Sequence, residues 1–576
     1  MSQYFHQTIR IGDVKIGGKH AISLQSMTST PTMNTVATVE QVIRIAQVGA
    51  HMVRITARNI REAKNLSLIK KELAAKGYHL PLIADIHFNP KAANVAATIV
   101  DKVRINPGNY MDKRSGKISW TEEEYHHELQ QIKERLKDLV NHCKTHQTVI
   151  RVGVNHGSLS DRVVNRYGNT ANGMAESALE FIHIFESLKF QQLVISLKAS
   201  NVLVMVEANK LLMNKMKARG YIYPLHLGVT EAGDAEDGRI KSAMGIGCLL
   251  AQDIGDTIRV SLTEEAEYEI PVAQKIVRAA QENRYTEEEA DARKFYRRRD
   301  SYKLDKIGHS QIVSVISSFR NQQSNTRADY FFNQQHKSLE TYEGETIFTY
   351  LSLDDLINEG FHRDLKYFTY LTPEDWTISL GKKVSCMKNL LIVLVKSENT
   401  NIHKIHELLK HFKQNSIQAP LILKIESPEK DLEKLLIHSS IQAGSFLIKG
   451  ALDGIWIEAQ RDTSDLAFGI LQASRQRISK TEYIVCPSCG RTLFNIQEKL
   501  QEVKSKTQEF VGLKIAVMGC IVNGLGEMAD ADYGYVGAGP GKVNLYQGHE
   551  LIIKNIPEDE AADQLLTIIK KKHHSL

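Results

Sequence analysis

Three cysteines near the C-terminal end of this 576-residue chain are the side chains best suited to metal chemistry. Cys486 and Cys489 stand in the run Cys-Pro-Ser-Cys-Gly, and Cys520 stands in Gly-Cys-Ile-Val-Asn-Gly-Leu-Gly-Glu. Both runs follow short apolar stretches, residues 483–485 and 514–518, so we expect each thiol on a loop that follows a strand. Loops that converge in space can present several thiolates to one soft metal centre.

The number of these thiols is informative because it stops at three. A closed structural zinc or iron–sulfur site takes four protein ligands, whereas a site with fewer leaves a metal open to substrate. Glu527, seven positions after Cys520, offers an oxygen donor for the fourth position. The spacing does not name the metal, and zinc with a histidine as fourth ligand stays open. The remaining cysteines have apolar or helical-looking neighbours and are predicted to be ordinary thiols: Cys143, Cys248 and Cys386.

The composition, with 42% hydrophobic and 24% charged residues, is typical of a soluble globular protein, and the length predicts two to four domains. Apolar runs such as residues 390–395 have the length of a strand, so we expect no membrane span. The first residues lack a secretory or transit signal, which predicts a cytoplasmic protein with reduced thiols. The net charge of +6 is spread along the chain and does not indicate nucleic-acid binding.

The first half of the chain repeats one pattern: a short β-branched run, a polar residue at its end, and a stretch with helical apolar spacing. Eight such units have the size and rhythm of a (β/α)8 barrel, with a doubly wound sheet as the alternative. The candidate strands are residues 21–25, 52–55, 82–86, 102–105, 149–152, 193–197, 225–229 and 257–260.

Cationic side chains recur at the ends of these candidate strands: Arg54, Arg104, Arg151, Lys198 and Arg259. A barrel gathers the C-terminal strand ends at one mouth, where so many like charges are unfavourable without an anionic partner. The pattern therefore predicts a phosphate or diphosphate site, for which the planar guanidinium is well suited. Asp85 and His87 are interpreted partly as structural partners of the arginines.

Glu231 follows another of the candidate strands, in the run Thr230-Glu231. Beside a bound anion, the negative surroundings would favour its protonated form and a proton-donating role. The alternative is a simple hydrogen-bond acceptor for a substrate hydroxyl.

Several strings in the chain follow one known family in order. They are Gln25-Ser-Met-Thr, Val53-Arg-Ile, Ala84-Asp-Ile-His-Phe, Arg104-Ile-Asn-Pro-Gly-Asn, Arg151-Val-Gly-Val-Asn-His-Gly-Ser-Leu, Ser196-Leu-Lys-Ala-Ser, His226-Leu-Gly-Val-Thr-Glu-Ala-Gly, Gly255-Asp-Thr-Ile-Arg-Val-Ser-Leu and both cysteine runs. With these, the chain closely resembles the 4-hydroxy-3-methylbut-2-enyl diphosphate synthase family of isoprenoid biosynthesis. The resemblance covers about the first 270 and the last 100 residues. One departure is Leu525, where many members have proline.

The resemblance implies a [4Fe–4S] cluster held by Cys486, Cys489 and Cys520, with Glu527 on the fourth iron until substrate displaces it. The implied substrate is 2-C-methyl-D-erythritol 2,4-cyclodiphosphate, which is opened reductively and dehydrated to 4-hydroxy-3-methylbut-2-enyl diphosphate. The two electrons imply an external one-electron carrier, flavodoxin or ferredoxin.

The family's site residues carry over onto matching positions of this chain. The implied diphosphate clamp consists of Arg54, Arg104, Arg151, Lys198, Arg259 and Ser261. The residues implied to border the reacting carbon skeleton are Asn155, Thr230, Glu231 and Asn523. The catalytic assignments are Glu231, as proton donor, together with Asn523 and Glu527.

We expect three domains: a substrate-binding barrel at 1–282, an inserted α/β domain that is partly barrel-like at 283–480, and an α+β iron–sulfur domain at 481–576. The insertion shows candidate strands at 312–316, 390–395, 421–425, 446–448 and 454–457, and a polar loop at 321–337. In two-domain relatives the barrel of one subunit meets the cluster domain of another. We interpret the insertion as a spacer that brings both faces together in one chain, with regulation or partner docking as the alternative.

A glycine-rich run, Gly537-Ala-Gly-Pro-Gly-Lys, lacks the spacing and hydroxyl residue of a phosphate loop and is predicted to lie near the cysteines. The rival function for the whole chain is a zinc-ribbon module on a phosphate-binding barrel that recognises RNA or a protein partner. On the main interpretation we expect no nucleic-acid or membrane partner, and a homodimer is left open.

Overall fold

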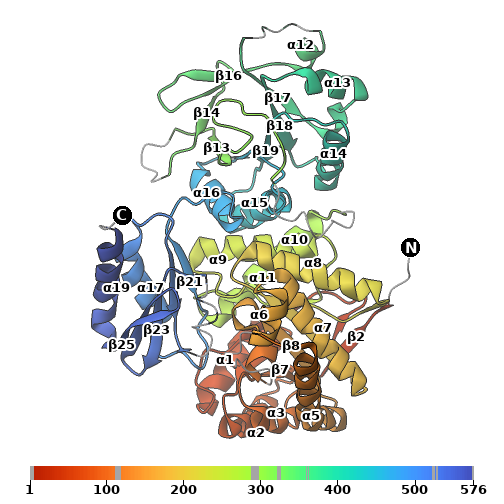
Figure 1. Cartoon of the computed structure of the whole chain (residues 1–576), viewed down its shortest axis with the longest axis vertical. Coiled ribbons are helices and arrows are strands. Elements are labelled where there is room, and N and C mark those ends of the chain that lie inside the picture. The colour runs from red at the N-terminus through yellow and green to blue at the C-terminus, as the bar shows by residue number, and fades with distance from the viewer. Residues whose placement is uncertain are drawn as a thin grey trace. The chain divides into compact units, whose positions relative to one another are not determined.

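The computed structural model describes residues 5–110, 119–286, 298–320, 326–358, 360, 362, 364–521, 526, 528 and 530–573. The chain forms two compact units, coloured by residue number in Figure 1. The first unit combines Met1–Ile246, Ile254–Gln274 and Lys480–Leu576, and the second combines Gly247–Asp253 and Lys275–Ser479. Each unit is described by itself. No helix of the described part is long and apolar enough to cross a membrane.

The first unit contains the expected (β/α)8 barrel. Its eight-stranded sheet has the order β11-β12-β4-β5-β6-β7-β8-β9, and a bridge between Ile195 and Leu225 joins the two ends. All neighbouring strands run parallel, and every candidate strand of this half coincides with an observed one. The strands are β4 (Ser23–Met27), β5 (Met52–Thr56), β6 (Leu82–Asp85), β7 (Lys102–Ile105), β8 (Val149–Asn155), β9 (Leu193–Lys198), β11 (His226–Leu227) and β12 (Thr257–Ile258).

Helices follow the strands because polar residues cap amphipathic segments. Asn59 and Asn89 accept a hydrogen bond from the backbone N–H three residues later, and Thr121 forms a full capping box with Glu124. The helices of the barrel region are α1 (Thr35–Gln47), α2 (Ile60–Ala75), α3 (Pro90–Ala97), α4 (Pro107–Tyr110), α5 (Glu122–His146), α6 (Asp161–Tyr167), α7 (Ala171–Ser187), α8 (Val202–Ala218), α9 (Ala235–Ser242), α10 (Cys248–Leu250) and α11 (Glu269–Glu282).

An N-terminal hairpin of β2 (Thr8–Ile11) and β3 (Val14–Gly17) fills one end of the barrel. Its buried isoleucines, Ile9, Ile11 and Ile16, pack against residues near the beginnings of four barrel strands. These residues are Met52, Ile83, Val149 and Val194. Nearby, β1 (Phe5–His6) pairs with β10 (Tyr221–Ile222). This apolar plug leaves the C-terminal strand ends as the place for polar chemistry.

The C-terminal part of the first unit is an α+β domain. Its five-stranded sheet has the order β21-β22-β23-β24-β25. The first three strands are parallel and the last two are antiparallel additions. The elements are β21 (Glu482–Val485), α17 (Ile496–Thr507), β22 (Lys514–Met518), β23 (Tyr533–Gly539), β24 (Lys542–Gln547), β25 (Glu550–Pro557) and α19 (Glu558–His573). The cysteine loops therefore follow β21 and β22, as the sequence predicts.

The second unit contains a closed barrel of its own, with strands in the order β13 to β20. It departs from the (β/α)8 pattern at β15, which is antiparallel to both neighbours. The strands are β13 (Ser314–Ser317), β14 (Tyr330–Asn333), β15 (Ser338–Glu340), β16 (Thr346–Tyr350), β17 (Tyr367–Leu371), β18 (Leu390–Lys396), β19 (Leu421–Glu426) and β20 (Gly454–Glu458). The helices are α12 (Leu353–Ile357), α13 (Ile378–Cys386), α14 (Ile402–Gln414), α15 (Leu432–Leu447) and α16 (Ser464–Ala473).

Two local predictions for this unit are wrong. Residues 446–448, predicted as a strand, lie at the end of α15, a helix whose second half is wholly buried and therefore apolar on all sides. The predicted polar loop at 321–337 includes strand β14.

Candidate functional site

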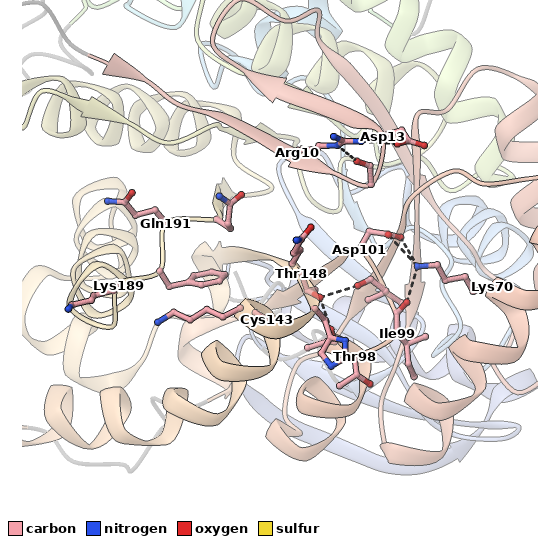
Figure 2. Close-up of a pocket in the computed structure, with 18 of the residues that line it drawn as sticks. Arg10, Asp13, Lys70, Thr98, Ile99, Asp101, Cys143, Thr148, Lys189 and Gln191 are labelled. Carbon is pink, nitrogen blue, oxygen red and sulfur yellow. Dashed lines mark hydrogen bonds and ion pairs between the residues drawn. The ribbon is translucent and has the colours of Figure 1, made fainter.

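Two hollows of the first unit lie at opposite ends of its barrel. The hollow at the N-terminal strand ends has polar groups that largely satisfy one another (Figure 2). Lys70 Nζ donates to Ile99 O at 3.0 Å and to Asp101 Oδ1 at 3.2 Å, and Thr148 Oγ1 donates to Ala97 O at 2.6 Å. Burial raises the pKa of the Cys143 thiol to about 12, which makes it an ordinary buried thiol. Acidic and basic side chains are mixed at this end of the barrel, without the cluster of cations found at the other end.

The pocket at the C-terminal strand ends gathers the residues that the sequence singles out. It is lined by all eight predicted substrate-binding residues, by Glu231 and by the three cysteines: Arg54, Arg104, Arg151, Asn155, Lys198, Thr230, Glu231, Arg259, Ser261, Cys486, Cys489 and Cys520. Asn523 and Glu527 lie outside the described residues.

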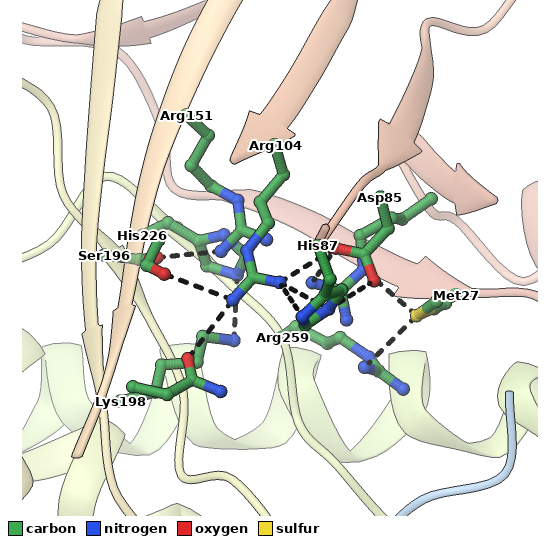
Figure 3. A network of polar contacts seen from close by, with 12 residues as sticks. Met27, Asp85, His87, Arg104, Arg151, Ser196, Lys198, His226 and Arg259 are labelled. Atoms are coloured by element: carbon green, nitrogen blue, oxygen red, sulfur yellow. Dashed lines mark hydrogen bonds and ion pairs between the residues drawn. The ribbon is translucent and has the colours of Figure 1, made fainter. Parts of the chain in front are cut away.

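Strand register explains why the barrel side chains meet. Residues paired across parallel strands point to the same face of a sheet. Asp85 pairs with Arg104, and Arg104 pairs in turn with Arg151. On the neighbouring strand pairs, Met27 of β4 pairs with Arg54 of β5, and Asn155 of β8 pairs with Lys198 of β9. The polar network that results is drawn in Figure 3.

Arg104 lies near the centre of this network. Its Nη2 donates to Gly153 O at 3.1 Å and to Asn155 Oδ1 at 3.4 Å, and its Nη1 lies 3.4 Å from Asp85 Oδ1. Nη1 is also 2.5 Å from His87 Nε2. Burial, then the charges of Arg104 and Arg491, lower the pKa of His87 to about 3. The imidazole is therefore neutral and accepts a hydrogen bond from the guanidinium.

Asp85 is a carboxylate shared among three arginines and the neutral ring of His87. Oδ1 lies 4.0 Å from Arg54 and 3.4 Å from Arg104, whereas Oδ2 lies 3.1 Å from Arg491 and 3.3 Å from His87 Nε2. Burial alone would raise the pKa of this carboxyl, but the surrounding cations hold it well below its usual range. Asp85 is therefore ionised and orients the arginines around it.

The other cations of the pocket differ in how far anions pair with them. Arg259 forms a two-pronged pair with Glu269 at 3.0 and 3.1 Å. Arg151 donates from Nη1 to Ser196 Oγ at 2.8 Å, while its buried Nε and Nη2 have no partner within the described part of the chain. Lys198 Nζ lies 3.4 Å from His226 Nε2.

The electrostatic balance of the pocket is positive. Burial, reinforced by neighbouring cations, lowers the pKa of Lys198 and Arg151 well below their ordinary values. The pKa of Arg54 falls to about 10 for the same first cause, although Asp85 opposes the shift. Cations that are buried and under-neutralised in one cleft require an anion of several charges. The geometry is therefore suited to a phosphate or diphosphate.

The two cysteine loops face this anion pocket from the C-terminal domain. Cys486 Sγ accepts a hydrogen bond from Gly519 N at 3.1 Å, next to Cys520. Burial raises the pKa of the Cys486 thiol, and the nearby Cys520, Cys489 and Glu231 act in the same direction. The side chains are thus close enough to repel as thiolates, a repulsion that a bound cationic metal centre would relieve.

The donor set near the pocket consists of three thiols from two loops, a ligand type that suits an iron–sulfur cluster. No three His, Cys, Asp or Glu side chains among the described residues come together tightly enough to hold one metal ion. A [4Fe–4S] cluster spaces its thiolates more widely because each binds a different iron. The glycine-rich run forms the turn between β23 and β24, and a Cβ built on Gly537 would lie 2.6 Å from Gly519 O, so this run does lie beside a cysteine loop.

The C-terminal domain is seated on the barrel of its own chain within the first unit. Val485 bridges to Ala232 next to Glu231, and Lys241 pairs with Glu482 at 2.8 Å. A Cβ built on Gly490 would lie 2.8 Å from Thr30 O, so the loop after Cys489 approaches the barrel backbone too closely for a larger residue.

Sequence reasoning missed several residues of the site. Arg491 lines the pocket from the C-terminal domain, and Glu269 neutralises Arg259 from α11. The position of Arg491, two residues after Cys489, was the available signal. Nothing in the sequence ties Glu269 to Arg259 specifically, because their pairing depends on how α11 packs.

Fold and site together define a class: a (β/α)8-barrel protein whose cationic mouth faces three clustered cysteines. Residues 6–274 match the family model of the GcpE TIM-barrel domain, and residues 482–571 match that of the GcpE protein C-terminal domain. The chain belongs to the GcpE family.

Curated relatives extend this match to nearly the whole chain. Proteins named 4-hydroxy-3-methylbut-2-en-1-yl diphosphate synthase (flavodoxin) are 44% identical in Bacteroides fragilis, over 98% of this chain and 95% of the relative, and 43% identical in Parabacteroides distasonis, over 98% and 97%. Among solved structures, a dihydropteroate synthase from Xanthomonas albilineans shares 14% identity with a TM-score of 0.31, covering 47% of this chain and 98% of that one. That likeness is too distant to support an argument about function.

Proposed function

We propose that this protein is a 4-hydroxy-3-methylbut-2-enyl diphosphate synthase. It would open 2-C-methyl-D-erythritol 2,4-cyclodiphosphate reductively and dehydrate it, using two electrons from an external carrier. The observation that carries this proposal is a pocket in which under-neutralised arginines face three cysteines. The names of full-length relatives support both the reaction and flavodoxin as the carrier, with ferredoxin as the alternative.

The proposed diphosphate clamp consists of Arg54, Arg104, Arg151, Lys198, Arg259 and Ser261. Arg151 is the clearest candidate to bind phosphate directly, because two of its buried nitrogens lack a partner among the described residues. Arg259 is held in place by Glu269, so it would present its remaining N–H to the ligand from a fixed position. Holding these groups on strand ends preorganises the clamp and limits the entropic cost of binding.

Glu231 is proposed as the proton donor to the departing hydroxyl. It is 3% exposed, Thr230 Oγ1 donates to its carboxylate, and its φ of 47° lies in the left-handed region. Such a backbone is unfavourable for a residue with a side chain and persists where the surroundings enforce it. Glu231 lines the same pocket as the clamp residues and the three cysteines, which supports this role.

Cys486, Cys489 and Cys520 would hold a [4Fe–4S] cluster, with Glu527 proposed as the fourth ligand and Asn523 beside the substrate. When bound, such a cluster supplies electrons one at a time. The protein's own contribution is to hold the cyclodiphosphate under the cysteine loops, to exclude water and to deliver a proton.

The second unit is proposed as a spacer, with partner docking or regulation as the alternative. The barrel and the C-terminal domain of the same chain form one compact unit, which supports a site completed within a single chain.

Anaerobic turnover tests the function. Purified without oxygen, the protein should contain about four irons per chain and convert the cyclodiphosphate in the presence of a chemical reductant. Colourless protein with one zinc, and no turnover after anaerobic reconstitution, would favour the zinc-ribbon alternative instead.

A further inference from the structure

Arg491 brings a cation from the C-terminal domain into a pocket whose other cations come from the barrel. It follows Cys489 by two residues and is 6% exposed. Its Nη2 donates to Asp85 O at 3.2 Å and to Asp85 Oδ2 at 3.1 Å. One guanidinium therefore connects the first cysteine loop to the end of strand β6.

The carboxylate that Arg491 contacts also serves the proposed clamp. Arg491 uses Oδ2 of Asp85, whereas Arg104 and Arg54 face Oδ1 at 3.4 and 4.0 Å. Because both oxygens belong to one planar group, a contact that fixes Oδ2 also fixes Oδ1. Figure 3 shows Asp85 and His87 on the same side of the Arg104 guanidinium. The position of Arg491 therefore affects the orientation of two arginines of the clamp through this shared carboxylate.

Attachment of the C-terminal domain does not depend on this contact. Lys241 pairs with Glu482 at 2.8 Å, and Lys504 pairs with Asp234 at 2.6 Å, and none of these four residues lines the pocket. Burial of the Arg491 cation is costly, and the Asp85 carboxylate at 3.1 Å offsets that cost. Arg491 therefore depends on the same carboxylate as the clamp arginines, which links its position to theirs.

We propose that Arg491 is a positioning residue, which acts through Asp85 to orient Arg54 and Arg104. The cysteine loop and the anion clamp then reach their working positions together. This proposal rests on the proposed function for the identity of the substrate. The coupling of Arg491 to Arg54 and Arg104 concerns anion binding and can be tested with any suitable anion.

The experiment measures binding of inorganic pyrophosphate by calorimetry, and the KM and kcat of cyclodiphosphate turnover, on anaerobically prepared protein. Arg491→Met should weaken pyrophosphate binding about tenfold to a hundredfold and raise KM in parallel. Arg491→Lys should recover only part of the loss, because lysine keeps the charge without the planar fork. Iron content and cooperative unfolding verify that each variant is folded and loaded.

Asp85→Asn separates positioning from simple charge. Removing a negative charge from a cationic pocket should strengthen anion binding if charge alone matters. If Asp85 orients the clamp, Asp85→Asn should weaken pyrophosphate binding. The double variant with Arg491→Met should then bind pyrophosphate no more weakly than the single variant of lower affinity. Lys504→Met is the matched control from the same interface and should leave the affinity within about twofold.

Stronger pyrophosphate binding by Asp85→Asn, fully additive losses in the double variant, or a loss in Arg491→Met no larger than that in Lys504→Met would overturn the proposal. Failure of the proposed function is a separate result. It would appear as wild-type protein without cyclodiphosphate turnover, and the pyrophosphate series would still decide the coupling.

Discussion

The two barrels of this chain place very different side chains at the C-terminal ends of their strands. In the first barrel, the strand ends carry Arg54, Arg104, Arg151 and Lys198, with Asp85 as the shared carboxylate. Several of these cations have depressed pKa values because burial is not offset by enough negative charge. This mouth is electrostatically incomplete without a ligand.

In the second barrel, a buried lysine has carboxylate partners from the chain itself. Lys424 pairs with Glu426 at 2.8 Å and Glu458 at 2.5 Å, and its ammonium lies 4.5 Å from the ring centre of Trp456 and 5.1 Å from that of Tyr370. Further aromatic rings fill the interior, including Phe332, Tyr350 and Phe368.

The difference shows how similar barrels can serve as a binding site or as a building block. Buried cations with too few carboxylate partners mark a place that expects an anion, whereas a buried cation that is paired with carboxylates and packed on aromatic rings contributes to stability. The following experiments test this distinction, beginning with the largest expected effect.

Cys520→Ala should abolish cluster assembly and turnover while the barrels stay folded, because three thiolates are already the minimum set. Iron and sulfide analysis, together with circular dichroism and thermal unfolding, would check this. Full iron content with full activity would show that Cys520 is not a ligand.

Arg151→Ala and Arg259→Ala should each weaken substrate binding by roughly 1.5–3 kcal/mol, or about tenfold to more than a hundredfold. The matching lysine variants should recover part of the affinity. Unchanged affinity in both alanine variants would remove these residues from the clamp, and would weaken the contrast between the two barrels.

His87 should make the first barrel sensitive to acid. Its pKa is lowered to about 3, chiefly by burial, whereas in the unfolded chain the ring titrates near 6.5. Stability from the neutral ring is therefore complete above pH 6.5 and is lost as the pH falls toward 3. Urea unfolding of iron-free protein at pH 7, 6 and 5 should show a loss steeper by up to about 1.4 kcal/mol per pH unit than in His87→Gln. Parallel pH profiles would mean that the ring takes up protons equally in the folded and unfolded states, which contradicts the lowered pKa.

Lys424→Met should lower the free energy of unfolding by roughly 1–2 kcal/mol and leave kcat/KM unchanged, because this lysine contributes to packing and ion pairing only. Lys198→Met is the matched change in the first barrel and should impair substrate binding. A large loss of activity in Lys424→Met would reveal a functional role for the second barrel.

No recovery of activity is expected when Arg54→Ala and Cys489→Ala chains are co-expressed. A site completed within one chain leaves each variant defective in its only barrel and cluster domain. Size and mass analysis would first establish whether mixed assemblies form. Recovered turnover in such assemblies would show that the site is shared between subunits.

The sequence predicted the elements whose signals are local. Each strand of the first barrel overlaps a short β-branched run, and each cysteine loop comes directly after an apolar strand. Residues 446–448 were wrongly predicted as a strand, because a short apolar run occurs both in strands and in buried helices. Strand β15 gave no signal, since Ser-Leu-Glu is short and carries no clear alternation.

The pairings within the site depend on tertiary structure and could not be predicted in the same way. The contact between Arg491 and Asp85 joins residues 406 positions apart, and that between Arg259 and Glu269 depends on where α11 begins. The roles of Asn523 and Glu527 remain predictions of the sequence.

The isoleucine hairpin that plugs the first barrel also has a kinetic consequence. With one end closed by Ile9, Ile11 and Ile16, we expect substrate and product to pass at the other end, where the cysteine loops line the pocket. The same gap must admit an anion, keep water out during reduction and release another anion afterwards. We therefore expect the C-terminal domain to move away from the barrel when product leaves, a kind of step that limits the rate in many enzymes.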